Sequence, residues 1–165
     1  MHILLLITTF YSKKNLKIRL FVVPQNTVNS VGYWLLKTDP DTYSYDDLEL
    51  DKRTVWDGVR NNLALLNMRY MKKGDLAFIY HTGTEKQIVG LATVTSNPYP
   101  DPKVKNQRFL VIDVEAKARL NKCVTLAQAK ERKEFRNFGL VRLSRLSVMP
   151  VDERIWKRIM LMAGF

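Results

Sequence analysis

The chain has 165 residues, 46% of them apolar and 26% charged, which is enough for one domain with one buried core. This composition argues against a disordered chain and against a membrane protein. With 27 basic and 16 acidic residues the formal net charge is +11, and a basic surface attracts a polyanion, most often nucleic acid. Charge alone leaves open a basic protein without such a partner.

The excess positive charge lies in the second half of the chain. Residues 31–102 contain eight basic and ten acidic side chains, whereas residues 103–165 contain fifteen basic and six acidic ones. We therefore expect one positive surface for phosphate contacts. Cys123 is the only cysteine, so no internal disulfide forms, and a reducing compartment follows: the cytoplasm or, in a eukaryote, the nucleus. With only two histidines as well, no metal site is expected.

The first 31 residues are expected to be a dispensable extension. Residues 3–10 are apolar, but the run is too short to span a membrane and lacks the flanking residues of a signal peptide. A polar break at residues 24–30 precedes the organised sequence. The domain is therefore expected over residues 32–165.

Branched and aromatic runs predict strands, while capping residues and apolar spacing predict helices. In chain order the expected elements are strand 32–37, a helix from Ser44, helix 61–71, strands 76–80, 88–94 and 109–115, helix 125–130, strand 145–150 and helix 152–162. The helix at 61–71 carries one stripe made of Leu63, Leu66, Asn67 and Tyr70. Trp34 and Trp156 are expected in the core.

The order of these elements predicts the fold class. Short strands scattered among short helices, without βαβ alternation, favour an α+β fold. We expect a small β-barrel or curled mixed sheet of about five to six strands, surrounded by short helices. The mouth of such a barrel is a natural pocket for one flat ligand.

Three segments carry a family resemblance: YWLLKTDP at residues 33–40, VWDGVRN at 55–61 and RLSVMPV at 145–151. Together they resemble the EVE domain, and the VWDGVRN run is highly specific to it. The resemblance covers residue 32 to the C-terminus. It implies a PUA-like barrel related to YTH domains, which reads modified cytosine or adenine in DNA or RNA without a cofactor or metal. Asp39 stands where glutamate is common in the family, which leaves the base preference open.

The same segments supply the candidate base pocket. Trp56 is expected to stack on the base, which is worth about 1–3 kcal/mol, although it can equally be a core indole. Asp57 and Asn61 are candidates for the edge of the base, and Asp57 can instead brace the turn at Gly58. The YTH-like arrangement places three further candidates on the opposite wall: Lys37, Thr38 and Asp39. His81 either caps the pocket or is structural. The candidate phosphate contacts are Arg60, Arg145 and Ser147.

No catalytic residue is expected. The sequence has no nucleophile elbow, no glycine-rich phosphate loop and no His-x-Glu motif with paired cysteines. We expect a monomeric, non-catalytic reader with nucleic acid as its partner and no membrane association. One alternative is a general RNA-binding accessory module without selectivity for a modified base; a hydrolase acting on modified nucleotides is less favoured.

Overall fold

A computed structural model describes residues 31–165. The predicted N-terminal extension therefore lies, except for Val31, outside the described residues. The elements are β1 (Tyr33–Thr38), α1 (Tyr45–Asp51), β2 (Arg53–Trp56), α2 (Asn62–Arg69), β3 (Leu76–His81), β4 (Gln87–Val94), β5 (Tyr99–Pro100), β6 (Leu110–Thr125), α3 (Leu126–Glu131), the 3-10 helix η1 (Lys133–Phe135), α4 (Gly139–Arg142), β7 (Val148–Pro150) and α5 (Glu153–Ala163).

The seven strands form one mixed sheet that curls into a half-barrel. The strand order is β2-β6-β4-β3-β1-β7, and β5 pairs with β6 beside this path. β1 and β3 are parallel, and the other pairs are antiparallel. Register shifts within the β3–β4 and β4–β6 pairs bend the strands, as bulges do. The curled α+β sheet with short helices around it confirms the predicted fold.

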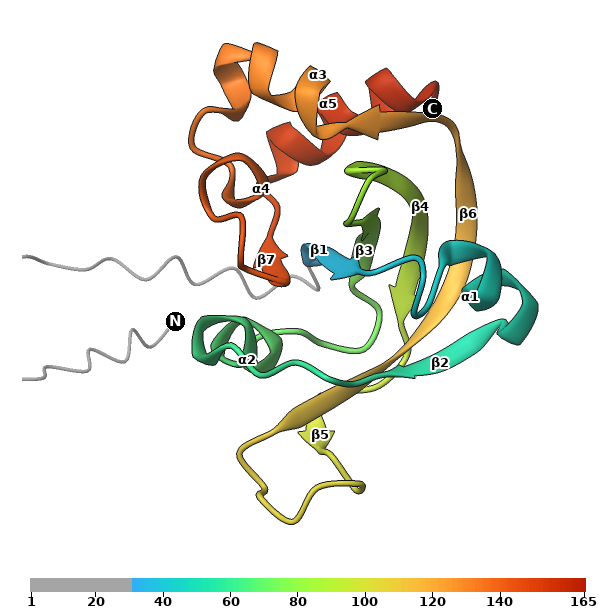
Figure 1. Ribbon diagram of the computed structural model, residues 1–165, viewed down its shortest axis with the longest axis vertical. Helices are drawn as coiled ribbons and strands as arrows, with labels where there is room; N and C mark the ends of the chain where they lie inside the picture. The colour runs from blue at the N-terminus through green and yellow to red at the C-terminus, as the bar shows by residue number, and fades with distance from the viewer. Residues whose placement is uncertain (1–30) are drawn as a thin grey trace, which may run out of the picture. The chain divides into compact units, whose positions relative to one another are not determined.

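The helices cover the ends and sides of this half-barrel. Figure 1 shows α3, α4 and α5 gathered at one end, and β5 with its loop at the other, joined by the long curved ribbon of β6. Helix starts follow from the sequence, because Ser44 and Thr125 each close a capping box with the residue three positions later. Asn61 and Asp152 cap α2 and α5 with their side-chain oxygens.

Several elements differ from the prediction. β2, β5 and α4 were not expected, and β6 continues to Thr125 rather than ending near residue 115. In α2 the buried residues are Ala64, Leu65 and Met68. The predicted stripe is largely exposed, since Leu63 and Leu66 are 46% and 44% accessible. Propensity predicted the helix, but packing against β7 and β6 decided which face is buried.

Aromatic side chains organise the core. Trp156 stacks on Phe78, with ring centroids 3.9 Å apart, and the buried Trp34 donates a 2.7 Å hydrogen bond from Nε1 to Asp75. Both tryptophans are buried, as predicted. Tyr45 lies so close to Gly90 that a Cβ at this position would be 2.2 Å from the ring. Only glycine fits there, and this contact anchors α1 on β4.

Candidate functional site

A pocket of about 450 Å³ lies where the two ends of the curled sheet face each other. β2 is one end of the strand order, β1 is next to the other end, and both contribute lining residues. The volume falls within the roughly 300–1,000 Å³ typical of small-ligand sites. The lining residues come from five segments of the chain: Lys37 and Thr38; Thr42 and Tyr43; Thr54, Val55, Trp56, Asp57, Gly58 and Val59; Lys103; and Ser147. We refer to this hollow as the Trp56 pocket.

Trp56 belongs to the core and to the pocket wall at once. It ends β2, where it is paired with Ile112 of β6, and only 7% of its surface is accessible. The next residues leave the sheet, because Gly58 adopts a left-handed backbone conformation with φ 74°. The indole is therefore held rigidly, with an opening beside it.

Lys37, Thr38 and Ser147 form the facing wall. The backbone N–H of Lys37 donates to the carbonyl of Ser147 at 2.9 Å, which fixes the loop before β7 against the end of β1. The Thr38 hydroxyl donates to the Tyr43 carbonyl at 2.7 Å. The Tyr43 hydroxyl donates to Asp51 Oδ2 at 2.9 Å, and burial is the main cause that raises the pKa of this phenol. The wall thus combines an aromatic ring with hydroxyl and ammonium groups.

Asp57 and Lys103 meet at the exposed rim of the pocket. Lys103 Nζ lies 2.9 Å from Asp57 Oδ2, and this hydrogen bond raises the pKa of the lysine. The pair joins the loop after β2 to the loop between β5 and β6. The guanidinium of Arg60 lies 4.3 Å from the centroid of Phe109, with Arg108 at 4.7 Å from the same ring, and these three residues do not line the pocket. The rim therefore carries one ion pair between an ammonium and a carboxylate.

Three candidate pocket residues do not line this pocket. Asn61 caps α2, with Oδ1 accepting from the backbone of Leu63 and Ala64, and Asp39 accepts from the backbone N–H of Asp41. His81 is buried: its Nε2 accepts from the backbone N–H of Tyr45 at 2.9 Å, and its Nδ1 lies 2.9 Å from Glu85. Their polar groups serve the local backbone, as buried or capping groups do.

The candidate phosphate contacts lie in different places. Ser147 lines the pocket, whereas Arg60 lies against Phe109 and does not line it. Arg145 is exposed on the loop of residues 143–147 and does not line the pocket. The lining residues Thr42, Tyr43, Thr54, Val55 and Lys103 were not singled out from the sequence as site residues. They come from loops and a short strand that carry no local signal of a site.

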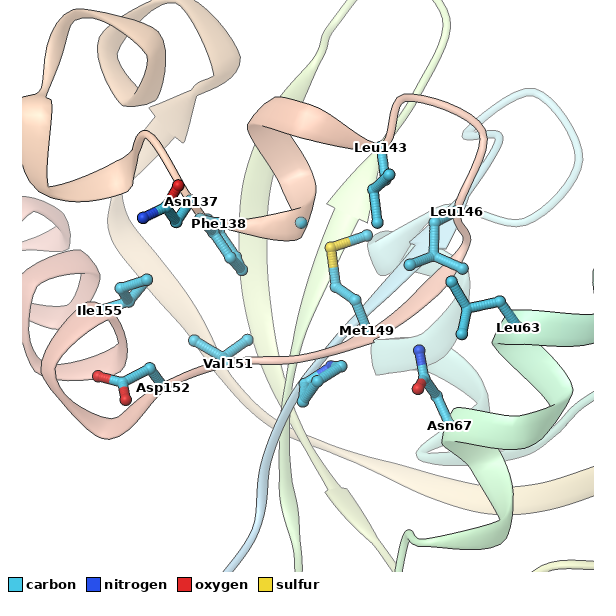
Figure 2. Close-up of a pocket in the computed structure, with 12 residues that line it drawn as sticks. Leu63, Asn67, Asn137, Phe138, Leu143, Leu146, Met149, Val151, Asp152 and Ile155 are labelled. Carbon is cyan, nitrogen blue, oxygen red and sulfur yellow. The ribbon is translucent and has the colours of Figure 1, made fainter. Parts of the chain in front are cut away.

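A second hollow lies on the other side of the loop of residues 143–147. Figure 2 shows this groove, of about 520 Å³, between α2, α4 and α5. Its walls are mainly apolar, including Leu63, Phe138, Leu146 and Met149. Asn67 donates its amide to the carbonyl of Val148 at 2.8 Å. The groove is larger than the Trp56 pocket, but no cationic side chain lines it.

Among residues 31–165, no three His, Cys, Asp or Glu side chains lie together in a way that could hold a metal ion. Within those residues no helix has both the length and the apolar character needed to cross a membrane.

The half-barrel with its pocket at the open side is an arrangement of the PUA-like class. The chain belongs to the EVE domain family, whose pattern matches residues 32–162. It is 28% identical to human thymocyte nuclear protein 1 over 159 aligned residues, covering 76% of this chain and 71% of that protein. The predicted family is therefore confirmed.

Solved structures agree with this assignment. A protein of Rhodopseudomonas palustris, solved by NMR, is 39% identical, with a TM-score of 0.77 over 81% of this chain and 94% of that one. Human THYN1 in complex with 5-methylcytosine containing DNA is 26% identical, with a TM-score of 0.75 over 81% of this chain and 98% of that one. An ASCH protein from Zymomonas mobilis, 12% identical with a TM-score of 0.54 over 79% and 95% of the two chains, is similar in fold alone.

Proposed function

We propose that this EVE domain is a non-catalytic reader that holds one modified base of a nucleic acid in the Trp56 pocket. The observation that carries the proposal is the pocket itself, which places an indole and a phenol beside hydroxyl, ammonium and carboxylate groups. Aromatic rings stack on any base, and the polar groups can bind the edge of the base. The structural relative crystallised with 5-methylcytosine containing DNA supports nucleic acid as the ligand class.

Charge supports the same ligand class. The chain carries a formal net charge of +11, and Lys37 and Lys103 line the pocket. Such cations bind phosphates without regard to sequence, so they supply affinity while the pocket supplies selectivity. A methyl group in an apolar recess adds only about 1–3 kcal/mol, and we expect discrimination of about 10- to 200-fold.

The experiment compares two tryptophans that are equally buried. Trp56 and Trp156 are 7% and 6% accessible, but only Trp56 lines the pocket. Trp56→Phe and Trp156→Phe each keep an aromatic ring in the core, and circular dichroism checks that both variants fold. Each protein is titrated with short single strands of DNA and of RNA that carry 5-methylcytosine, 5-hydroxymethylcytosine, N6-methyladenine or the unmodified base.

For the native protein and Trp156→Phe we expect the same preference for one modified strand. For Trp56→Phe we expect the ratio of affinities for the modified and the plain strand to fall towards one, while a salt-sensitive affinity for all strands is retained. A native protein that binds modified and plain strands equally is a general nucleic-acid-binding module, and the reader proposal is then wrong. If both phenylalanine variants lose selectivity equally, the pocket assignment is wrong.

A further inference from the structure

A third hollow, of about 200 Å³, shares Lys37 with the Trp56 pocket. Its walls come from the end of β1, the β3–β4 turn, α3, and α4 with the residue at position 144. Three of its lining side chains are lysines, Lys37, Lys86 and Lys130, and none of the described residues that line it is acidic. Tyr80, Thr82 and Ser144 add hydroxyl groups to the walls. We call it the lysine hollow.

The positive charge of the lysine hollow has no counter-charge from the described residues. Within residues 31–165 the lysines in ion pairs are Lys103 and Lys157, so no carboxylate oxygen lies within 4.0 Å of the three lysines of the hollow. Glu85, next to Lys86 in the chain, is instead held by His81 at 2.9 Å and by Gln87 at 3.0 Å. A cluster of cations without a partner attracts an anion.

Lys37 is the most constrained of the three lysines. Its Nζ donates to the carbonyl of Ser144 at 3.1 Å and lies 5.5 Å from the centroid of the Tyr80 ring. Burial lowers the pKa of this lysine, since its ammonium has lost part of its water without gaining an opposite charge. An anion in the hollow would supply the missing charge.

The frame of the lysine hollow is fixed by the backbone. Thr82 N–H donates to the carbonyl of Thr38 at 2.9 Å, and Leu126 N–H donates to the carbonyl of Lys86 at 2.7 Å. These bonds tie the β3–β4 turn to β1 on one side and to α3 on the other. Lys86 adopts a left-handed conformation with φ 49°, which is uncommon for a residue other than glycine or asparagine. The hollow is therefore shaped before any ligand arrives.

We propose that the lysine hollow binds a phosphate group, and that this is a phosphate flanking the base held in the Trp56 pocket. The proposal rests on the proposed function, since the shared residue Lys37 makes the two hollows neighbours on one surface. A strand with one base in the Trp56 pocket would carry its backbone over their common wall. Lysine binds phosphate as a point charge and needs no fixed geometry. A free nucleotide offers the same phosphate chemistry.

The test uses charge variants of the full chain. Lys86 and Lys130 are exposed at their ends, so the double variant Lys86→Gln/Lys130→Gln keeps the core intact. The matched control is Lys72→Gln/Lys73→Gln, which removes the same charge from two exposed lysines that line none of the three hollows. Both are titrated at several salt concentrations with strands carrying 5-methylcytosine or cytosine.

We expect the hollow variant to bind both strands about tenfold more weakly at low salt, and the slope of log K against log salt to fall by about 1.4, or about 0.7 per lost contact. A neutral methylphosphonate linkage beside the methylated base should weaken the native protein similarly and the hollow variant no further. A different result is that the neutral linkage has no effect, while free 5-methyldeoxycytidine monophosphate displaces the strand from the native protein but not from the hollow variant. The phosphate bound in the hollow then comes from a free nucleotide.

The proposal is overturned if the hollow and control variants lose equal affinity. The ratio of methylated to plain binding, taken from the same titrations, reports separately on the Trp56 pocket. A ratio of one together with lysine-dependent binding would refute the reader and retain the phosphate site. If the ratio stays above one and binding does not depend on Lys86 and Lys130, the reader is retained and the phosphate site is refuted.

Discussion

The Trp56 pocket and the apolar groove flank the same loop, residues 143–147, yet they offer different chemical groups. The groove is the larger, at about 520 Å³ against about 450 Å³. Its polar side chains are already engaged, because Asn67 binds the carbonyl of Val148 and Asp152 caps α5 through Arg154 N–H at 2.8 Å. The Trp56 pocket has more charged and hydroxyl groups beside its aromatic rings, including two lysines, and several of these groups are engaged as well: Asp57 with Lys103, and the Thr38 hydroxyl with the Tyr43 carbonyl.

The proposed site is the smaller of the two hollows, so the proposal rests on its chemical groups and not on its volume. A groove forms between helices wherever their side chains do not fill the space between them. A groove with apolar walls offers few hydrogen bonds, so it discriminates poorly among ligands of similar shape. Recognition needs polar groups aimed into a hollow, because an unpaired polar group on either partner is costly once water is excluded. The following predictions test whether the two hollows differ in this way.

The largest effect is expected from Met149→Ala in the groove. Met149 is 1% accessible, and its truncation should lower the free energy of unfolding by about 2–5 kcal/mol. The binding of a modified strand per folded molecule should not change. Urea denaturation measures the first quantity, and titration at a temperature where the variant is folded measures the second. A folded Met149→Ala protein with weakened binding would break the distinction between the hollows.

An intermediate effect is expected from His81→Ala. The buried backbone N–H of Tyr45 loses its acceptor, which costs about 1–3 kcal/mol of stability. His81→Gln should restore part of this, because its side-chain carbonyl can accept the same hydrogen bond. Binding selectivity should be unchanged in both variants. Loss of selectivity in the stable glutamine variant would return His81 to the list of pocket residues.

The smallest effect on stability is expected from Asp57→Asn. Its ion pair with Lys103 is exposed, so the midpoint of urea denaturation should hardly move. Affinity for plain strands at low salt should rise by about two- to fivefold, because a carboxylate no longer repels phosphate, and the gain should vanish at high salt. Selectivity among bases should fall, since an acceptor for the edge of the base has changed.

Asp41→Asn is the control for this last change. Asp41 is exposed and lines none of the three hollows, so its substitution removes a carboxylate without changing a pocket. It should leave base selectivity as it is. If both aspartates behave alike, Asp57 acts only through its charge.

The sequence predicted the fold better than it predicted the pocket. Runs of β-branched residues are local signals of strands, and capping residues are local signals of helices. The helices that start after Ser44 and Thr125 were predicted from such capping residues. β6 was predicted too short because half of residues 116–123 are polar and only one of them is a large aliphatic residue: this part of the strand is largely exposed, with only Leu120 buried. β2 has four residues and no alternation, so only its pairing with β6 identifies it.

Pocket residues that were missed share a physical reason. Tyr43 and Lys103 reach the Trp56 pocket from loops that are distant in the sequence, and only the curl of the sheet brings them together. The family resemblance found Trp56 and Asp57 because they lie inside a specific motif. It also suggested Asn61, whose side chain serves the start of α2. Motif membership thus does not separate a residue that faces a ligand from one that shapes the turn beside it.

The position of the Trp56 pocket has a mechanical consequence. Among the described residues, no backbone ladder connects β2 with β1 or β7, the strands at the opposite end of the order. A ligand that contacts both ends at once binds only the curled, folded sheet. It would therefore raise the free energy of unfolding by about 2.7 kcal/mol at a concentration one hundred times Kd. Part of the stability of the occupied domain would then come from its ligand.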